Sequence, residues 1–67
     1  MSEELKKFIK NRALATFRVK DYIGAYSKQE LADMIGMSRP TLDVRISKSN
    51  WRMHELENIT TKLPELV

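Results

Sequence analysis

The chain has 67 residues, of which 42% are hydrophobic and 31% are charged, and it contains no cysteine. This length predicts a single domain with a small core, and the lack of cysteine excludes disulfide bonds, so a helical bundle or a dimer interface must supply the stability. The formal net charge is +3, and residues 53–67 hold one basic and three acidic groups, so the positive charge lies in the first 52 residues, consistent with a polyanion approaching from one side.

Residues 1–25 are predicted to be helical. Ser2 is a suitable N-cap for a helix whose apolar stripe comprises Leu5, Phe8 and Ile9. Beyond that stripe the apolar residues do not share one face, which leaves open one helix to about residue 22 or two shorter helices that meet near residues 11–12. A strand that begins near residues 17–19 is a further alternative. Gly24 is expected to end the segment.

Residues 27–47 are predicted to form two short helices joined by a tight turn. Ser27 and Glu30 have the spacing of a capping box at the start of the first helix, and Ser38 can cap the second. Gly36 can adopt a positive φ and end the first helix, so that the second leaves at a steep angle. This is the pattern of a helix-turn-helix, with inward-facing positions at Leu31, Ala32, Met34, Ile35, Leu42 and Ile46.

Residues 50–63 are predicted to form the last helix. Trp51 stands at staple distance from the helix and is expected to be a core anchor rather than a base-stacking ring. Asn50 is a candidate cap for this helix, because Arg52 is a poor one, and Pro64 is expected to stop it. The inward stripe of this helix is expected to be Met53, Leu56, Ile59 and Leu63. The tail 65–67 is a candidate dimer contact.

Together these segments predict one all-α domain over residues 1–67, a compact bundle of four to five helices with a central helix-turn-helix. The run Lys28–Leu42, KQELADMIGMSRPTL, resembles the helix-turn-helix of the Cro and lambda-repressor family, and a looser similarity continues to Leu63. The resemblance implies a lambda-repressor-like fold, a homodimer, operator DNA as the partner, and a role as a phage or prophage regulator. Family members usually have one short helix before the motif, so residues 1–25 depart from the pattern and are expected to add core or dimer surface.

The helix from Arg39 to about residue 47 is expected to be the recognition helix. Arg39 can form a bidentate contact to guanine, and Pro40 and Val44 can touch a thymine methyl group. Asp43 can accept a hydrogen bond from cytosine N4 or pair with Arg39 one turn away, and the two alternatives stay open. Arg45 is expected at a phosphate, with a salt bridge inside the fold as its alternative.

Further contacts are expected at phosphates. Lys28 and Gln29 stand at the start of the first motif helix, where free N–H groups favour an anion, although Lys28 can equally be solvated. The polar residues 47–50 are expected to make a loop near the backbone of the duplex. The complete predicted DNA-contact set is Lys28, Gln29, Ser38, Arg39, Pro40, Thr41, Asp43, Val44, Arg45 and Lys48.

Residues for catalysis or for binding a metal or a cofactor are not apparent. His54 is the single histidine and is expected at the surface, and no glycine-rich loop can hold a nucleotide. We therefore expect no enzyme activity, no cofactor and no small-molecule substrate. No run reaches the ~20 apolar residues of a membrane span, and the lack of cysteine fits the cytoplasm of a bacterial cell or phage-infected host.

The sequence thus predicts a sequence-specific regulator that binds double-stranded DNA. The alternative is a protein-interaction module, such as an antirepressor that binds another regulator, which a moderate charge and an acid on the outer helix face would suit. A DNA-binding fragment of a longer protein is also open.

Overall fold

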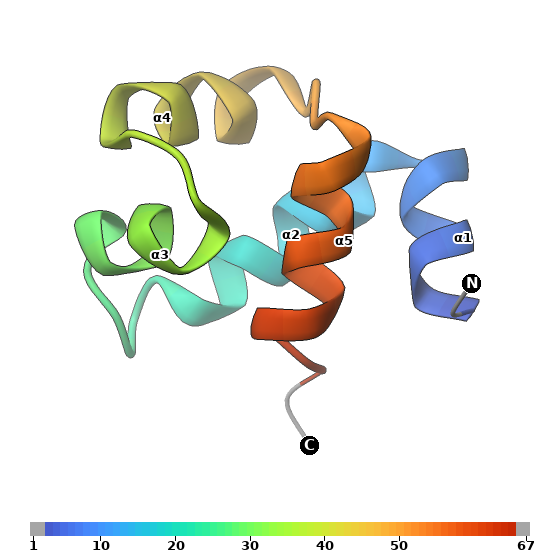
Figure 1. Ribbon diagram of the computed structural model, residues 1–67, viewed down its shortest axis with the longest axis horizontal. Helices are drawn as coiled ribbons and strands as arrows, with labels where there is room; N and C mark the ends of the chain where they lie inside the picture. Colours follow the sequence, from blue (N-terminus) through green and yellow to red (C-terminus); the bar gives the residue numbers. More distant parts are fainter. Residues whose placement is uncertain (1–2, 66–67) are drawn as a thin grey trace.

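The computed structural model of the protein describes residues 3–65. In this range the chain is all-helical and has no strand, so the predicted all-α bundle is confirmed and a strand near residues 17–19 is wrong. The molecule measures 27 × 25 × 17 Å (Figure 1). The predicted cap Ser2 and residues 66–67 of the tail lie outside the described range. The helices are α1 (Glu3–Lys10), α2 (Arg12–Tyr22), α3 (Lys28–Ile35), α4 (Arg39–Lys48) and α5 (Met53–Lys62).

The N-terminal segment forms two helices, and the break lies at Asn11. The backbone of Asn11 is extended, and its side-chain oxygen accepts the N–H of Ala13 at 3.1 Å, which caps α2. The alternative of one continuous helix is therefore wrong. Gly24 does not end α2 as expected: the helix stops at Tyr22, and Gly24 is not among the residues with positive φ. The carbonyl of Tyr22 instead accepts the N–H groups of Ala25 and Tyr26.

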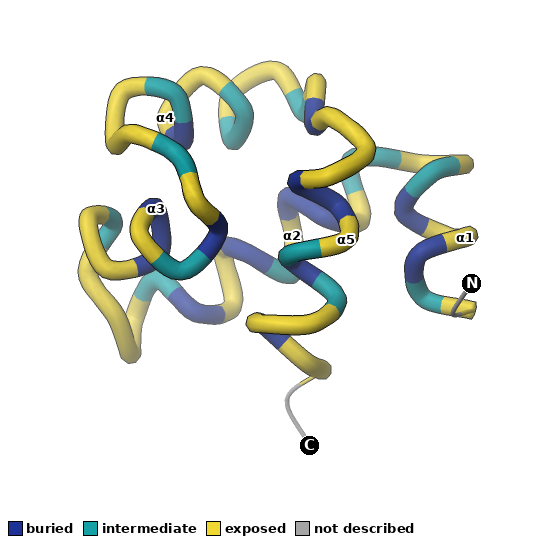
Figure 2. Tube along the Cα trace, viewed as in Figure 1, coloured by how far each residue is buried: buried dark blue, intermediate teal, exposed yellow. Residues whose placement is uncertain are grey.

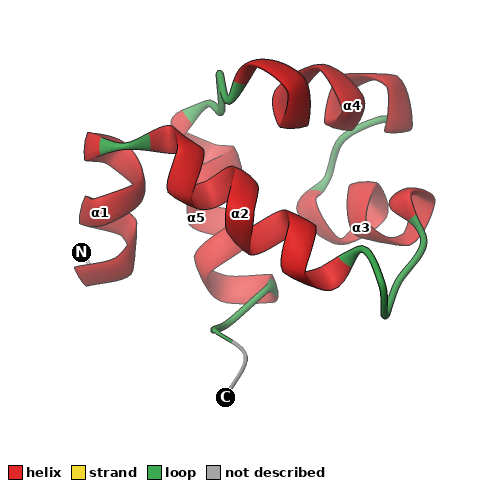
Figure 3. Ribbon diagram, turned by 180° about the vertical axis from the view of Figure 1, so that it is seen from behind, coloured by secondary structure: helices red, strands yellow, loops and turns green. Residues whose placement is uncertain are grey.

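Helix α2 crosses the rear of the molecule and connects α1 to the remaining helices (Figure 3). Arg18 on α2 joins three parts of the fold. Its guanidinium pairs with Glu4 on α1, donates to the carbonyl of Leu63 at 3.0 Å and lies 5.3 Å from the centre of the Phe8 ring. The first helix is therefore tied to both α2 and the end of α5.

Helices α3 and α4 form the predicted helix-turn-helix pair, and local sequence signals account for its turn. Ser27 and Glu30 make the capping box: Ser27 Oγ accepts the Glu30 N–H at 3.1 Å, and the Glu30 carboxylate accepts the Ser27 N–H at 3.2 Å. Gly36 ends α3 with φ of 85° and ψ of 38°, a left-handed conformation that glycine adopts without steric cost. Ser38 then caps α4, so only three residues separate the two helices.

The core lies where the inner faces of all five helices meet (Figure 2). The small side chain of Ala32 is fully buried, in line with its predicted place on the inner face of the motif. The stripe on α5 is confirmed except at Met53, which is 43% exposed because it occupies the first position of the helix, at the rim of the bundle. The largest fully buried side chains are Trp51, Leu31, Ile35, Leu42, Leu56, Ile59, Leu63 and Val19.

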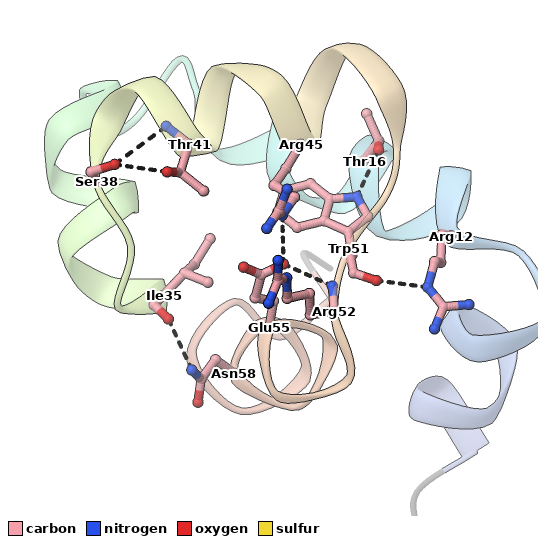
Figure 4. Close-up of polar contacts among 10 residues, drawn as sticks. All are labelled: Arg12, Thr16, Ile35, Ser38, Thr41, Arg45, Trp51, Arg52, Glu55 and Asn58. Atoms are coloured by element: carbon pink, nitrogen blue, oxygen red, sulfur yellow. Dashed lines mark hydrogen bonds and ion pairs between the residues drawn. The ribbon is translucent and has the colours of Figure 1, made fainter.

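Trp51 is a core residue, as expected, and it fastens the loop between α4 and α5 to α2. It is 2% exposed, and its ring N–H donates to Thr16 Oγ1 at 2.9 Å. Thr16 Oγ1 also lies 2.7 Å from the hydroxyl of Ser49, the residue that ends α4 with φ of 55°. Arg12 Nε donates to the Trp51 carbonyl at 2.7 Å (Figure 4). A side-chain network from α2 therefore fixes where α4 ends.

The N-cap of α5 differs from the expectation. Arg52, and not Asn50, occupies the cap position, and a guanidinium has no acceptor for the free N–H groups of a helix start. Glu55 supplies part of what is missing, because its Oε1 accepts the Arg52 N–H at 2.7 Å. At the turn between α3 and α4, Asn58 Nδ2 on α5 donates to the carbonyl of Ile35 at 2.8 Å and so gives one carbonyl at the end of α3 a partner. None of the helices within residues 3–65 has the length and apolarity needed to cross a bilayer.

Candidate nucleic-acid interface

Helix α4 lies on the surface of the bundle, along one side of the molecule (Figure 1). Only Leu42 among its ten residues is buried, and most of its length is exposed (Figure 2). Leu42 anchors the inner side, and Ile46, one turn later, is half-buried beside it. The helix therefore presents a rod to solvent, and we define its outer face as the exposed residues Arg39, Pro40, Asp43, Val44, Ser47 and Lys48.

Arg45 does not belong to the outer face, although it was among the predicted phosphate contacts. Its side chain is 12% exposed, and its Nε donates to Glu55 Oε1 on α5 at 2.8 Å (Figure 4). The Glu55 side chain is 5% exposed. The alternative interpretation of Arg45, a salt bridge within the fold, is therefore the one that the structure bears out. The physical reason is that the first turn of α5 brings the Glu55 carboxylate to the Arg45 side chain.

Asp43 and Lys28 form an ion pair between α4 and α3. Lys28 Nζ lies 3.0 Å from Asp43 Oδ1, and the two side chains are 41% and 47% exposed. The predicted alternative in which Asp43 pairs with Arg39 is therefore wrong, and Lys28 is paired and not merely solvated. The pair neutralises the single acidic residue of α4, so the acid does not leave a net negative charge on the outer face.

The remaining predicted contacts at the start of each helix are engaged locally. Gln29 Nε2 donates to Asp33 Oδ1 at 3.1 Å on the exposed side of α3. Ser38 Oγ donates to Thr41 Oγ1 at 2.8 Å and accepts the Thr41 N–H at 3.4 Å (Figure 4). Ser38 is exposed and Thr41 is half-buried, and their hydroxyls are hydrogen-bonded to each other.

Arg39 and Lys48 are the outer-face cations without a partner. Both are exposed, and within residues 3–65 neither side chain takes part in a hydrogen bond or an ion pair. They stand at the two ends of α4, and Val44, 43% exposed, lies between them. The outer face thus carries a cation at each end, a neutralised acid and an apolar contact point between them.

Arg52 is a residue that the predicted contact set omits. It is exposed immediately after the loop that follows α4, and its backbone, not its side chain, takes part in the cap of α5. The signal for it was present in the sequence: an arginine at an N-cap cannot accept a hydrogen bond and so keeps its side chain outside the helix start. Arg52 is therefore an exposed cation that follows Lys48 by four residues, beyond the C-terminal end of α4.

The unpaired cations of the outer face suit contact with an anionic polymer, and the exposed helix can fit against a grooved surface. The titratable side chains of the outer face do not form an acid–base pair. His54 is exposed, as expected for a surface residue. Glu55 is engaged with Arg45 and the Arg52 backbone, whereas Glu57 is exposed, so these two carboxylates do not share a site.

Comparison of the chain with protein-family models, with curated proteins and with solved structures finds no match.

Proposed function

We propose that this protein is a sequence-specific regulator that binds double-stranded DNA in the manner of Cro and lambda-repressor-like proteins. The observation that carries the proposal is the outer face of α4, an exposed helical rod on which the free charges are cationic and the single acid is paired. A B-DNA major groove admits an α-helix, and the N-terminal residues of a recognition helix meet the base edges. Phosphate attraction supplies the sequence-independent part of the affinity.

Four side chains of the outer face, together with Arg52, have a role in this proposal. Arg39, in the first turn of α4, donates two hydrogen bonds to guanine O6 and N7. Pro40 and Val44 contact thymine methyl groups, which are apolar projections in the groove. Lys48 lies in the last turn and binds a phosphate, as does Arg52 beyond the loop.

The proposal includes a homodimer. One ten-residue helix makes too few contacts for a typical operator affinity, and a two-fold dimer would present two such helices ~34 Å apart to successive major grooves. A regulator of this kind would act in the cytoplasm of a bacterial cell or phage-infected host, where the DNA is. Sedimentation of the protein with a duplex of two half-sites should find two chains per duplex, and one chain per high-affinity duplex would reject the dimer.

The proposed activity is tested by fluorescence anisotropy. Duplexes selected from a randomised pool with the purified protein are titrated at several salt concentrations. We expect affinity to fall steeply with salt, and the selected duplex to bind about 10³-fold or more tightly than a scrambled one. Binding that is absent, or that ignores both salt and sequence, would reject DNA recognition.

One observation favours the second candidate, a protein-interaction module such as an antirepressor. Leu14 and Phe17 on α2 are 38% and 60% exposed, and they line a hollow of about 310 Å³ together with residues of α1 and Glu65. Exposed apolar side chains beside a hollow are typical of protein contact sites. Recovery of a regulator from a host lysate by the wild-type protein but not by Phe17→Ser, together with no retention of DNA, would decide for this candidate.

A further inference from the structure

The ion pair between Lys28 and Asp43 joins the two helices of the helix-turn-helix. Lys28 is the first residue of α3, and Asp43 is in the middle of α4, so the contact spans the turn of the helix-turn-helix. Lys28 Nζ donates to Oδ1 of Asp43, and among the described residues no hydrogen bond to the second carboxylate oxygen, Oδ2, is found. The Asp43 side chain is 47% exposed on the outer face, between Arg39 and Ser47. One oxygen of a half-exposed carboxylate is therefore held by Lys28, and the other has no hydrogen-bond partner among the described residues.

We propose that Asp43 reads a cytosine in the DNA site, and that Lys28 is the positioning residue that holds its carboxylate for that contact. The inference rests on the proposed function, and it goes further by assigning the chemistry of one base position. The positive charge of Lys28 offsets the repulsion between the Asp43 carboxylate and the DNA phosphates. The second carboxylate oxygen of Asp43, Oδ2, then accepts a hydrogen bond from cytosine N4–H in the major groove.

The carboxylate selects cytosine for reasons of hydrogen-bond chemistry. An ionised aspartate can only accept hydrogen bonds, and cytosine N4 is a donor with no acceptor beside it on the major-groove edge of that base. Adenine presents a donor at N6 but also an acceptor at N7, which repels the second lone pair of a carboxylate. Guanine and thymine present acceptors at the corresponding positions, so the same oxygen disfavours them.

The position of Asp43 relative to Arg39 sets the spacing between the two base pairs that these side chains contact. The residues are four apart on α4, which corresponds to about 6 Å along the helix axis. Successive base pairs of B-DNA rise by about 3.4 Å, so the guanine read by Arg39 and the cytosine read by Asp43 should lie within two base-pair steps of each other. A selected site should therefore contain two closely spaced G·C pairs in each half.

Selection from a randomised duplex pool, followed by sequencing, tests the assignment with variants of the full chain. Asp43→Ala should lose the preference for cytosine at one position by about 5- to 150-fold and keep the preference for guanine that depends on Arg39. Asp43→Asn should change the preference at the same position from cytosine to adenine, because an amide can donate to N7 and accept from N6. Both substitutions fall on a half-exposed pair, so thermal melting should show folded variants.

The role of Lys28 is tested by Lys28→Met in two backgrounds. In the wild-type background, Lys28→Met should weaken the cytosine preference at the position read by Asp43 and leave other positions unchanged. In the Asp43→Ala background, it should have no further effect on base preference, because there is no carboxylate left to position. A uniform loss of affinity in both backgrounds, with a smaller salt dependence, would assign Lys28 to a phosphate and overturn its positioning role.

The outcomes separate this inference from the proposed function. If the wild-type protein binds selected duplexes and Arg39→Ala relaxes the guanine preference, the proposed function stands. If Asp43→Ala and Asp43→Asn then keep the wild-type preference at every position, the reading of cytosine by Asp43 is overturned alone. If the wild-type protein selects no duplex, both fall together.

Discussion

Arg45 Nε on α4 and Glu55 Oε1 on α5 lie 2.8 Å apart, and the same carboxylate oxygen accepts the backbone N–H of Arg52 at 2.7 Å. The buried Glu55 carboxylate therefore has two roles: it compensates the charge of Arg45, and it caps the start of α5. The contact holds the underside of α4 on the start of α5, and this leaves the outer face of α4 as the side that can meet a ligand (Figure 4).

Loss of this carboxylate should cost much of the stability of the fold. Glu55→Ala leaves the Arg45 side chain, which is only 12% exposed, without its partner, and breaking a pair with one fully buried member should cost up to about 3–5 kcal/mol in the free energy of unfolding. Glu57→Ala, an exposed acid on the same helix, is the matched control and should stay within about 0.5 kcal/mol of the wild type. Urea denaturation measures both. Equal effects of the two substitutions would mean that the Arg45 contact contributes nothing.

The Thr16 hydroxyl should contribute to the stability of the fold, because it accepts the indole N–H of Trp51 and is hydrogen-bonded to the hydroxyl of Ser49. Thr16→Val keeps the shape but removes the partner of the buried indole N–H, and we expect a loss of about 1–3 kcal/mol in the free energy of unfolding. Thr61→Val replaces an exposed threonine on α5 and serves as the control. Thermal melting compares the two variants. A Thr16→Val protein that melts with the control would show that the network is dispensable.

Replacement of the two glycines of the chain by alanine should change the stability in opposite directions or by different amounts, because only Gly36, in the turn between α3 and α4, has a positive φ. Gly36 has φ of 85°, so Gly36→Ala forces a side chain into the left-handed region and should cost about 1–2 kcal/mol in the free energy of unfolding. Gly24 has no positive φ, and a methyl group there meets no atom within 4 Å, so Gly24→Ala should be neutral or stabilising by up to about 1 kcal/mol. Denaturant titration of the pair checks the sign of each change, and the reverse order would contradict the backbone argument.

Lys48 should contribute to DNA binding without regard to sequence. Lys48→Ala should weaken binding by a similar factor for every duplex and reduce the slope of log affinity against log salt by about 1, as loss of one phosphate contact does. Lys62→Ala removes the same charge from the far end of α5, away from α4 (Figure 1), and should leave the slope unchanged. Anisotropy titrations across salt give both slopes. Identical slopes for the two variants would mean that net charge, not the place of Lys48, governs binding.

The sequence predicted the elements that depend on neighbouring residues. The capping box of Ser27 and Glu30, the left-handed Gly36 and the cap at Ser38 are all set within a few residues, and each was confirmed. The burial of Trp51 also followed from its spacing to Leu56. The break at Asn11 stayed undecided, because an asparagine is tolerated within a helix as well as at its start.

Contacts between residues far apart in the chain were beyond the sequence. The sequence placed Arg45 at a phosphate, with a salt bridge inside the fold as its alternative, and only the position of the first turn of α5 supplies Glu55 as its partner. The partner of Asp43 is Lys28, 15 residues earlier, because the turn brings the start of α3 beside the middle of α4. Local spacing pointed instead to Arg39. Of the predicted contact set, Arg45 is therefore withdrawn, and Asp43 and Lys28 are joined into one unit.

The central claim is that the outer face of α4 binds a DNA duplex, and Arg39 tests it most directly. Arg39 is exposed and bonds to no described residue, so Arg39→Ala should fold like the wild type. In anisotropy titrations with the selected duplex and its guanine-substituted forms, we expect this variant to lose about 1–3 kcal/mol of discrimination at one guanine, while Lys62→Ala keeps the wild-type preference. Unchanged discrimination in a folded Arg39→Ala protein, or no duplex binding by the wild type, would contradict the account.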